Sequence, residues 1–363
     1  MDKKWTAIII LASSIPLIII LFSLISPKLS PTQAVLENCN TLEFNSNQAT
    51  NIVFFSGKEQ AEEYKNFFQE TAPFDKYKKA FNFYYIDSYT PKCELYQGIA
   101  ILCHNKETIK KGASCPNDYL IVLEEHPTNI RSSSYENVMS INTNHPLSVL
   151  THEFGHAFAN LAEEYTPAKI PKGSENCAQE CSDFGYETDG CYEGCSESTY
   201  QRSIANGVMR TLSSNEYGKL NEALIIGKIR KNSPTTITGK AIQELCEEKS
   251  YYLIEGLYRN GAISILNKSI EHGCVGSNGA GTFTYELQTF QGTTLTESEF
   301  NPELIFTDAQ GENEIEGETI ISDRPFILKI QKIPQGEKLS ISESERELAN
   351  VRLTDIGARA CEI

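Results

Sequence analysis

The sequence predicts an α+β protein, in which a mixed sheet carries a histidine-bearing helix and a small β-sandwich follows toward the C-terminus. Three observations lead to this prediction. Apolar residues recur at three- and four-residue steps over residues 147–161, which indicates an amphipathic helix. Strand and helix patterns alternate over residues 50–142, whereas strand patterns alone resume after about residue 250. A chain of 363 residues is also too long for one typical core.

The N-terminus has the pattern of a membrane anchor. Lys3 and Lys4 precede an apolar run, residues 5–26, which is long enough to cross a bilayer and favours a cytoplasmic N-terminus. We therefore predict a cytoplasmic tail at residues 1–4, an uncleaved single-pass anchor, and a stalk at residues 27–48. The alternative is a cleaved signal peptide and a secreted protein. In both cases the remaining chain lies outside the cytoplasm.

The next region, residues 49–235, has the alternating pattern of a mixed α/β unit. Period-two runs bounded by turn residues indicate strands, and stripes at three- and four-residue steps indicate helices. We expect strands at residues 51–55, 81–86, 119–123 and 138–142, and helices at residues 59–70, 74–80 and 215–230, together with the histidine-bearing helix, which begins at residue 146 and whose stripe reaches residue 161.

The C-terminal region, residues 250–363, has strand patterns without intervening helix patterns. The dipeptide Asn260-Gly261 stands between two apolar runs, and it is among the strongest short signals for a β-hairpin. Alternation of apolar and polar residues returns around Phe283, Leu304 and Phe326. These short strands predict a small β-sandwich.

The histidine-bearing helix contains the segment His152-Glu153-Phe154-Gly155-His156. At about 100° per residue the two imidazoles lie about 40° apart, roughly opposite the apolar stripe. A His-Glu-x-x-His helix binds zinc through its two histidines, and the glutamate serves as a general base. The other interpretation is two histidines on a solvated helix face, with Glu153 as an ordinary surface acid.

A catalytic zinc ion needs a third protein ligand and an open position for water. Glu163 and Glu164 follow the motif, and the sequence favours neither over the other. A straight helix would carry both too far along its axis, at about 1.5 Å per residue. The chain must therefore turn back, and Asn160 tolerates the left-handed conformation that such a turn needs.

The stretch from His152 to Tyr165 resembles the IgA-peptidase-like zinc metallopeptidases, a family with metzincin character. The motif of that family usually has Gly at the position of Asn160 and Asp at the position of Glu163. A looser similarity extends over residues 50–230. The resemblance implies a zincin-like sheet and active-site helix over residues 49–235.

The segment Asn206-Gly207-Val208-Met209-Arg210 resembles the Met-containing turn of the same family. The resemblance implies that Met209 forms the floor of the metal site without binding zinc. The alternative for Met209 is a gap-filling role in the core, which is common for single methionines.

From these residues we expect a zinc-dependent endopeptidase that hydrolyses protein or peptide substrates outside the membrane. The strand at residues 138–142, next to the helix, is the expected edge that pairs with extended substrate. A phenol would stabilise the tetrahedral intermediate. The candidates for this role are Tyr165, Tyr192, Tyr200 and Tyr217.

Two other classes of protein are compatible with the same residues. The first is a surface binding or adhesion protein with a non-catalytic zinc site, and the second is a zinc hydrolase of another amide, such as a cell-wall peptide. Nucleic-acid binding is not expected, because the chain has 32 basic against 48 acidic residues.

Eleven cysteines indicate an oxidising compartment. Cys177, Cys181, Cys191 and Cys195 form a dense cluster between the helix and the Met-containing segment. The cluster predicts two disulfides, and the alternative is a structural zinc site with four thiolates. Another local pair is expected among Cys93, Cys103 and Cys115, and the odd count leaves one cysteine over.

Overall fold

A computed structural model describes residues 36–185, 188–232, 246–302, 304–307, 324–344, 346–354 and 356. These residues belong to one compact unit that extends from Leu36 to Ile363. The predicted anchor at residues 5–26 and the eleventh cysteine, Cys361, lie outside the described residues. Within the described ranges, no helix is long and apolar enough to cross a membrane.

A seven-stranded mixed sheet forms the centre of the N-terminal half. Its strands are β1 (Asn40–Glu43), β2 (Thr50–Phe55), β3 (Phe81–Ile86), β6 (Tyr119–Glu124), β7 (Ser132–Tyr135), β8 (Val138–Asn142) and β16 (Leu304–Thr307). Their order is β1-β3-β2-β6-β8-β7-β16. The four inner strands β3, β2, β6 and β8 run parallel, and the remaining three pair antiparallel with their neighbours. Together with the helices, this sheet confirms the α+β class.

The predicted stalk is too long at its C-terminal end. Strand β1 lies within residues 27–48 and pairs with β3, opposite Tyr84 and Tyr85. Its neighbour Cys39 is also tied by a disulfide to Cys115. The last part of this segment is therefore sheet and not linker.

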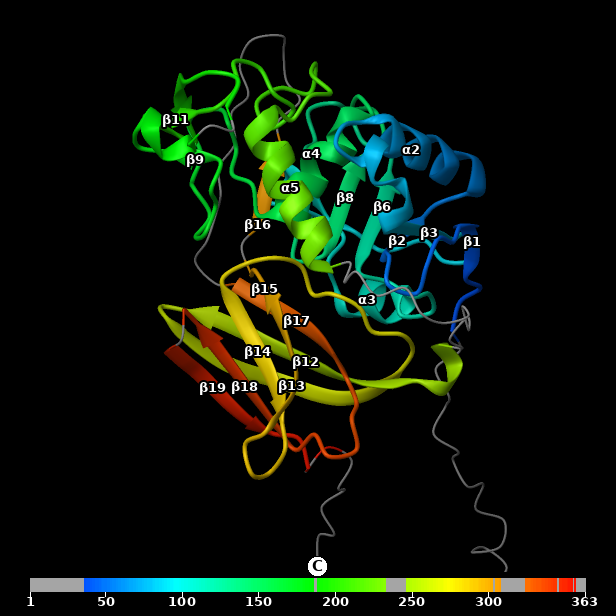
Figure 1. Cartoon of the computed structure of the whole chain (residues 1–363). Coiled ribbons are helices and arrows are strands. Elements are labelled where there is room, and N and C mark those ends of the chain that lie inside the picture. Colours follow the sequence, from blue (N-terminus) through cyan, green and yellow to red (C-terminus); the bar gives the residue numbers. More distant parts are fainter. Residues whose placement is uncertain are drawn as a thin grey trace, which may run out of the picture. The chain divides into compact units, whose positions relative to one another are not determined.

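Three helices cover one face of the sheet (Figure 1). They are α2 (Lys58–Glu70), α4 (Ser148–Ala159) and α5 (Lys219–Asn232). Their apolar stripes bury one continuous core with the sheet, in which Phe68, Phe74, Phe81 and Phe154 make stacked and edge-to-face contacts. The histidine-bearing helix is thus fixed to the sheet by its apolar side, as its periodicity predicts.

The boundaries of several predicted helices shift. Helix α4 begins two residues after Pro146, and α5 begins four residues after residue 215. The predicted helix at residues 74–80 consists of two short 3₁₀ turns, η1 (Phe74–Lys76) and η2 (Lys78–Ala80). Short segments of this kind form single turns more readily than α-helices, because nucleating an α-helix is costly.

The prediction that residues 138–142 form the edge strand that pairs with substrate is wrong. Strand β8 coincides with the predicted residues 138–142, but it lies between β6 and β7 and is buried along its length. In the sheet, β7 pairs antiparallel with β8 on the side away from β6, and β16 pairs with the other edge of β7. Helix α4 packs against β7, β8 and β16. Periodicity reveals that a strand exists but not which strands flank it, because pairing is a long-range property.

The opposite face of the sheet is covered by smaller elements. They are the hairpin β4 (Glu94–Tyr96) and β5 (Ala100–Leu102), the helix α3 (Lys106–Gly112) and the strand β12 (Ser250–Arg259). Ile101, Ile109, Tyr251 and Leu253 join this second core. The C-terminal strands therefore share a core with the central sheet.

Two antiparallel sheets make up the C-terminal part. One has the order β13-β12-β17 and the other β15-β14-β18-β19. Their remaining strands are β13 (Ala262–His272), β14 (Phe283–Gln288), β15 (Thr294–Phe300), β17 (Arg324–Gln331), β18 (Lys338–Glu343) and β19 (Arg346–Arg352). Apolar residues of both sheets form one cluster. The predicted hairpin is confirmed, since Asn260 and Gly261 take positive φ between β12 and β13.

The cysteine-rich excursion folds as a small sheet with order β10-β11-β9. Its elements are β9 (Cys177–Ala178), η3 (Cys181–Phe184), β10 (Tyr192–Cys195) and β11 (Glu197–Arg202). The predicted disulfides are confirmed, as Cys177 pairs with Cys195 and Cys181 with Cys191. The local pair is Cys93–Cys103, and the other bonds are Cys39–Cys115 and Cys246–Cys274, where Cys246 opens η4 (Cys246–Glu248).

Candidate metal centre

Helix α4 ends abruptly after its second histidine, and this turn builds the site. Asn160 takes the left-handed conformation, with φ of 53°, as its sequence position predicts. The N–H groups of Asn160 and Leu161 donate to the carbonyls of His156 and Gly155, at 3.0 and 3.2 Å. These bonds satisfy the helix end and reverse the chain. The residues that follow therefore return toward the histidines.

Two imidazoles and one carboxylate converge beside this turn. The Nε2 atoms of His152 and His156 lie 3.0 Å apart. Each also lies 3.2 Å from one carboxylate oxygen of Glu163, Oε2 for His152 and Oε1 for His156. Among the described residues these three form a buried group whose ligand atoms all lie within 4.8 Å of one another. The donor set is one that zinc prefers.

Backbone carbonyls fix the orientation of both rings. Nδ1 of His152 donates to the carbonyl of Val208 at 2.8 Å, and Nδ1 of His156 donates to that of Leu161 at 2.6 Å. Because a carbonyl only accepts, the Nδ1 atoms carry the protons. In its neutral form, each ring would then present the lone pair of Nε2 to the common centre, as metal-binding histidines do.

The electrostatics of the group favour a bound cation. Burial opposes the ionisation of Glu163, but the two imidazoles outweigh it and lower the pKa of this carboxyl to about 2. Burial also opposes the charging of His152, whereas the Glu163 carboxylate raises the pKa of its imidazole to about 9. The Glu163 carboxylate thus stabilises positive charge between the two Nε2 atoms. A divalent cation at the same place would be stabilised in the same way.

Glu153 is buried next to this group. It belongs to the same turn of α4 as His152 and His156, and its side chain is fully inaccessible. Its charge contributes to raising the pKa values of His152 and Tyr165. The carboxylate therefore stands within electrostatic reach of both.

Glu164, the other candidate ligand, is directed to different partners. Its Oε1 accepts from Nδ2 of Asn221 at 2.8 Å and from Nδ2 of Asn176 at 3.4 Å. Burial raises the pKa of this carboxyl to about 7, against the two amides that lower it. The structure brings Glu163, and not Glu164, into the histidine group.

The Met-containing turn packs beneath α4. Val208 supplies the carbonyl that orients His152, and the carbonyl of Met209 accepts from the N–H of Glu164 at 2.8 Å. Met209 is fully buried, and its sulfur stands over the Cα of Gly155, between the two histidines in sequence. Met209 thus lies under the helix turn that carries the rings.

The close approach of Met209 predicts a cost for a side chain at residue 155. A Cβ on Gly155 would lie 2.8 Å from the sulfur of Met209 and 3.2 Å from the ring of Tyr217. We expect Gly155→Ala to lower the free energy of unfolding of the metal-free protein by about 1–3 kcal/mol, measured by urea titration. Gly227→Ala in α5 is the control, because its Cβ meets no atom within 4 Å. Equal stability of the two variants would contradict this packing.

Only Tyr165 of the four candidate tyrosines lies beside the group. It is buried, and a hydrogen bond and the negative charge of Glu163 add to burial in raising its pKa well above the usual value. Tyr217 lies in the core and donates to the carbonyl of Thr151. The other two belong to the excursion. There, the Tyr200 hydroxyl accepts from Gln179 at 3.1 Å, and Tyr192 is 37% exposed beside Arg202.

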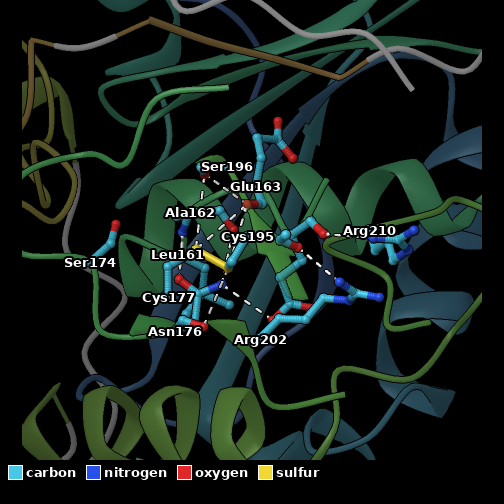
Figure 2. Close-up of a disulfide and its surroundings, with 12 residues drawn as sticks. Leu161, Ala162, Glu163, Ser174, Asn176, Cys177, Cys195, Ser196, Arg202 and Arg210 are labelled. Carbon is cyan, nitrogen blue, oxygen red and sulfur yellow. Dashed lines mark hydrogen bonds between the residues drawn. A yellow bond between two sulfur atoms is a disulfide. The ribbon is translucent and has the colours of Figure 1, made fainter. Parts of the chain in front are cut away.

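The cysteine-rich excursion contacts the chain at Glu163, the third ligand candidate. The sequence did not predict this contact. Figure 2 shows the Cys177–Cys195 bond against the chain that leads from α4 to Glu163. Asn176 and Ser196 flank these two cysteines. The only available signal was that polar residues directly adjoin the paired cysteines, and this does not identify their partners.

Asn176 and Ser196 hold the backbone at Glu163. The side chain of Asn176 accepts from the N–H of Ala162 at 2.7 Å and donates to its carbonyl at 2.9 Å. The hydroxyl of Ser196 donates to the carbonyl of Glu163 at 2.8 Å. All of these residues except Glu163 are fully buried, and Glu163 is nearly so. The excursion therefore sets the position of the Glu163 backbone.

Loss of this clamp should weaken metal binding without removing a ligand. We expect Asn176→Ala to raise the dissociation constant for zinc by about 10–100-fold, the usual cost of removing a group that supports a ligand. Competition with a chromophoric chelator measures this constant. Gln179→Ala, at an exposed position in the same excursion, is the matched control and should bind like the wild type. Unchanged affinity in Asn176→Ala would contradict the clamp.

No family model matches this chain, and no curated protein matches it significantly. The interpretation of the site therefore rests on its own geometry. The feature that carries it is the convergence of His152, His156 and Glu163.

Proposed function

We propose that this chain is a zinc-dependent endopeptidase whose metal is held by His152, His156 and Glu163. The convergence of two oriented Nε2 atoms and one buried carboxylate supports this assignment. A zinc ion held by these three residues would leave one coordination position for water, as in catalytic rather than structural zinc sites. Glu164 is not proposed as a ligand, because its carboxylate is bound by two amides.

The proposed chemistry uses the residues around this centre. When bound, zinc would lower the pKa of water to about 7 and polarise the scissile carbonyl. Glu153 would accept the proton of the attacking water and deliver it to the leaving amine nitrogen. The phenol of Tyr165 is our candidate for stabilising the negative oxygen of the tetrahedral intermediate, since it is the candidate tyrosine that contacts Glu163.

The proposed class is a metzincin-like peptidase, as the resemblance to the IgA-peptidase-like family implies. The antiparallel strand β7, which packs against α4, and the sulfur of Met209, which lies against Gly155 of the same helix, support this proposal. We further propose that the C-terminal part is a small β-sandwich, because its two antiparallel sheets bury a common core.

We propose an extracytoplasmic location for the described part of the chain. Five disulfides among the described residues support an oxidising compartment. The apolar run at residues 5–26 would anchor the protein to the membrane, or would direct its secretion if it is cleaved. The substrate would then be an external protein or peptide.

The decisive experiment combines metal analysis with a cleavage assay. We expect one zinc per purified chain and hydrolysis of a mixed peptide library, measured by mass spectrometry. Removal of zinc by 1,10-phenanthroline should abolish the cleavage, and added zinc should restore it. Bound zinc without cleavage would favour the binding protein with a non-catalytic site, and cleavage confined to cell-wall peptides would favour the other amide hydrolase. A chain that binds no zinc would refute the proposal.

A further inference from the structure

A buried lysine lies outside the metal centre. Lys329 lies in the middle of β17, opposite Leu253 of β12, and only 1% of its surface is exposed. Its partner is Asn117, a fully buried residue just before β6 of the central sheet. The two are 212 positions apart in sequence, and Nζ of Lys329 donates a hydrogen bond to Oδ1 of Asn117.

This environment favours a neutral amine. Among the residues that the structure describes, the Asn117 oxygen is the hydrogen-bond acceptor of the Lys329 amine. One neutral acceptor stabilises a buried ammonium poorly. Burial accordingly lowers the pKa of Lys329 to about 8, although the charge of Asp118 opposes the shift. A desolvated lysine with a lowered pKa is a nucleophile.

Both partners are held in place. Nδ2 of Asn117 donates to the carbonyl of Cys115 at 2.7 Å, so the amide nitrogen is bound on that side while the amide oxygen accepts from the amine. The backbone of Lys329 is bound on both sides by Asn278, whose Oδ1 accepts at 2.9 Å and whose Nδ2 donates at 3.0 Å. A nucleophile held against a carbonyl gains a high effective concentration.

We propose that Lys329 and Asn117 are a modification site, at which an intramolecular isopeptide bond joins Nζ to the side-chain carbon Cγ. The lone pair of the neutral amine attacks Cγ, and the bond between Cγ and Nδ2 breaks. A proton from the amine passes to the departing nitrogen, which leaves as ammonia. The product is a secondary amide, and the step needs no oxidant, reductant or further reactant.

The bond would tie the C-terminal sheets covalently to the central sheet. A cross-link over so long a stretch of chain restricts the unfolded state, as a disulfide does, but reduction does not break it. This inference is independent of the proposed peptidase activity, since neither residue belongs to the metal centre.

Mass spectrometry of the full chain tests the proposal directly. The protein is denatured and fully reduced, so that disulfides do not contribute to its mass. We expect a mass lower than that of the sequence by one ammonia, and after proteolysis a single branched peptide that contains both Asn117 and Lys329. A mass equal to that of the sequence, with the two residues on separate peptides, would overturn the proposal and leave a simple hydrogen bond.

Two variants show where an ammonia deficit arises. Lys329→Met removes the nucleophile but keeps an apolar side chain in the core, and it should have the full mass of its own sequence. Lys332→Met, at an exposed position three residues away, should keep the deficit. A deficit that persists in Lys329→Met would place the loss of ammonia elsewhere and would also overturn the proposal. Both measurements are made on denatured protein and do not depend on the stability of either variant.

Discussion

Glu163→Gln should lose zinc, whereas Glu164→Gln should keep it. The two glutamates are adjacent and both are buried, but only Glu163 contacts both histidines. An amide oxygen is a weak zinc ligand, so the dissociation constant of Glu163→Gln should rise by more than the roughly 100-fold cost of losing a supporting group. Titration with a competing chelator gives both constants under identical conditions.

Glu164→Gln also has a predicted effect on stability. Burial raises the pKa of Glu164 from its usual 4.5 to about 7 in the folded protein. The folded state therefore holds a proton that the unfolded state has lost, and the stability of the wild type falls as the pH rises between these values. Glutamine does not titrate, so its advantage should grow over this range and level off above about pH 7.

The outcome of this pair of variants is informative in either direction. Loss of zinc in Glu164→Gln with retention in Glu163→Gln would reverse the ligand assignment. Retention in both would exclude a glutamate ligand and leave only the two histidines. Urea titration of the metal-free variants separates loss of a ligand from loss of fold.

Glu153→Gln should keep zinc and lose peptide cleavage. The glutamine has the size and shape of the glutamate but cannot accept a proton from water. Positioned general bases contribute about 10²–10⁴-fold, so kcat/KM should fall by that factor while the zinc content stays at one per chain. Elemental analysis and the cleavage assay on the same preparation measure both quantities.

Glu125→Gln is the control for this variant, because Glu125 is an exposed carboxylate in the loop after β6. It should cleave at the wild-type rate. Full activity in Glu153→Gln would remove Glu153 from the mechanism even if the metal site were correct. Loss of zinc in the same variant would instead indicate a structural role.

Local features of this protein could be predicted from its sequence. The apolar stripe of α4, the left-handed Asn160 and the Asn260-Gly261 hairpin each depend on a few consecutive residues. The two disulfides of the excursion follow from the dense spacing of its cysteines, once an oxidising compartment is assumed. Backbone preferences and side-chain periodicity operate over one or two turns, and the sequence contains that information directly.

The arrangement of strands could not be predicted in this way. Strand β8 was expected at an edge because it precedes α4. Instead, a tight turn joins it to β7, which pairs with it, and β16 pairs with β7 from more than 150 residues further along the chain. The pairing of strands depends on which surfaces meet in the folded chain. The sequence pattern of one strand does not identify the strands that pair with it.

The sequence by itself determined that two histidines share one face of a helix and that the chain turns back directly after it. Only the tertiary structure decided which glutamate returns to them, because the choice depends on Asn176, Ser196 and Asn221, which come from other segments. The burial of Lys329 against Asn117 was decided in the same way. Short-range geometry is set by neighbouring residues, whereas the surroundings of a side chain are set by distant parts of the chain that meet only on folding.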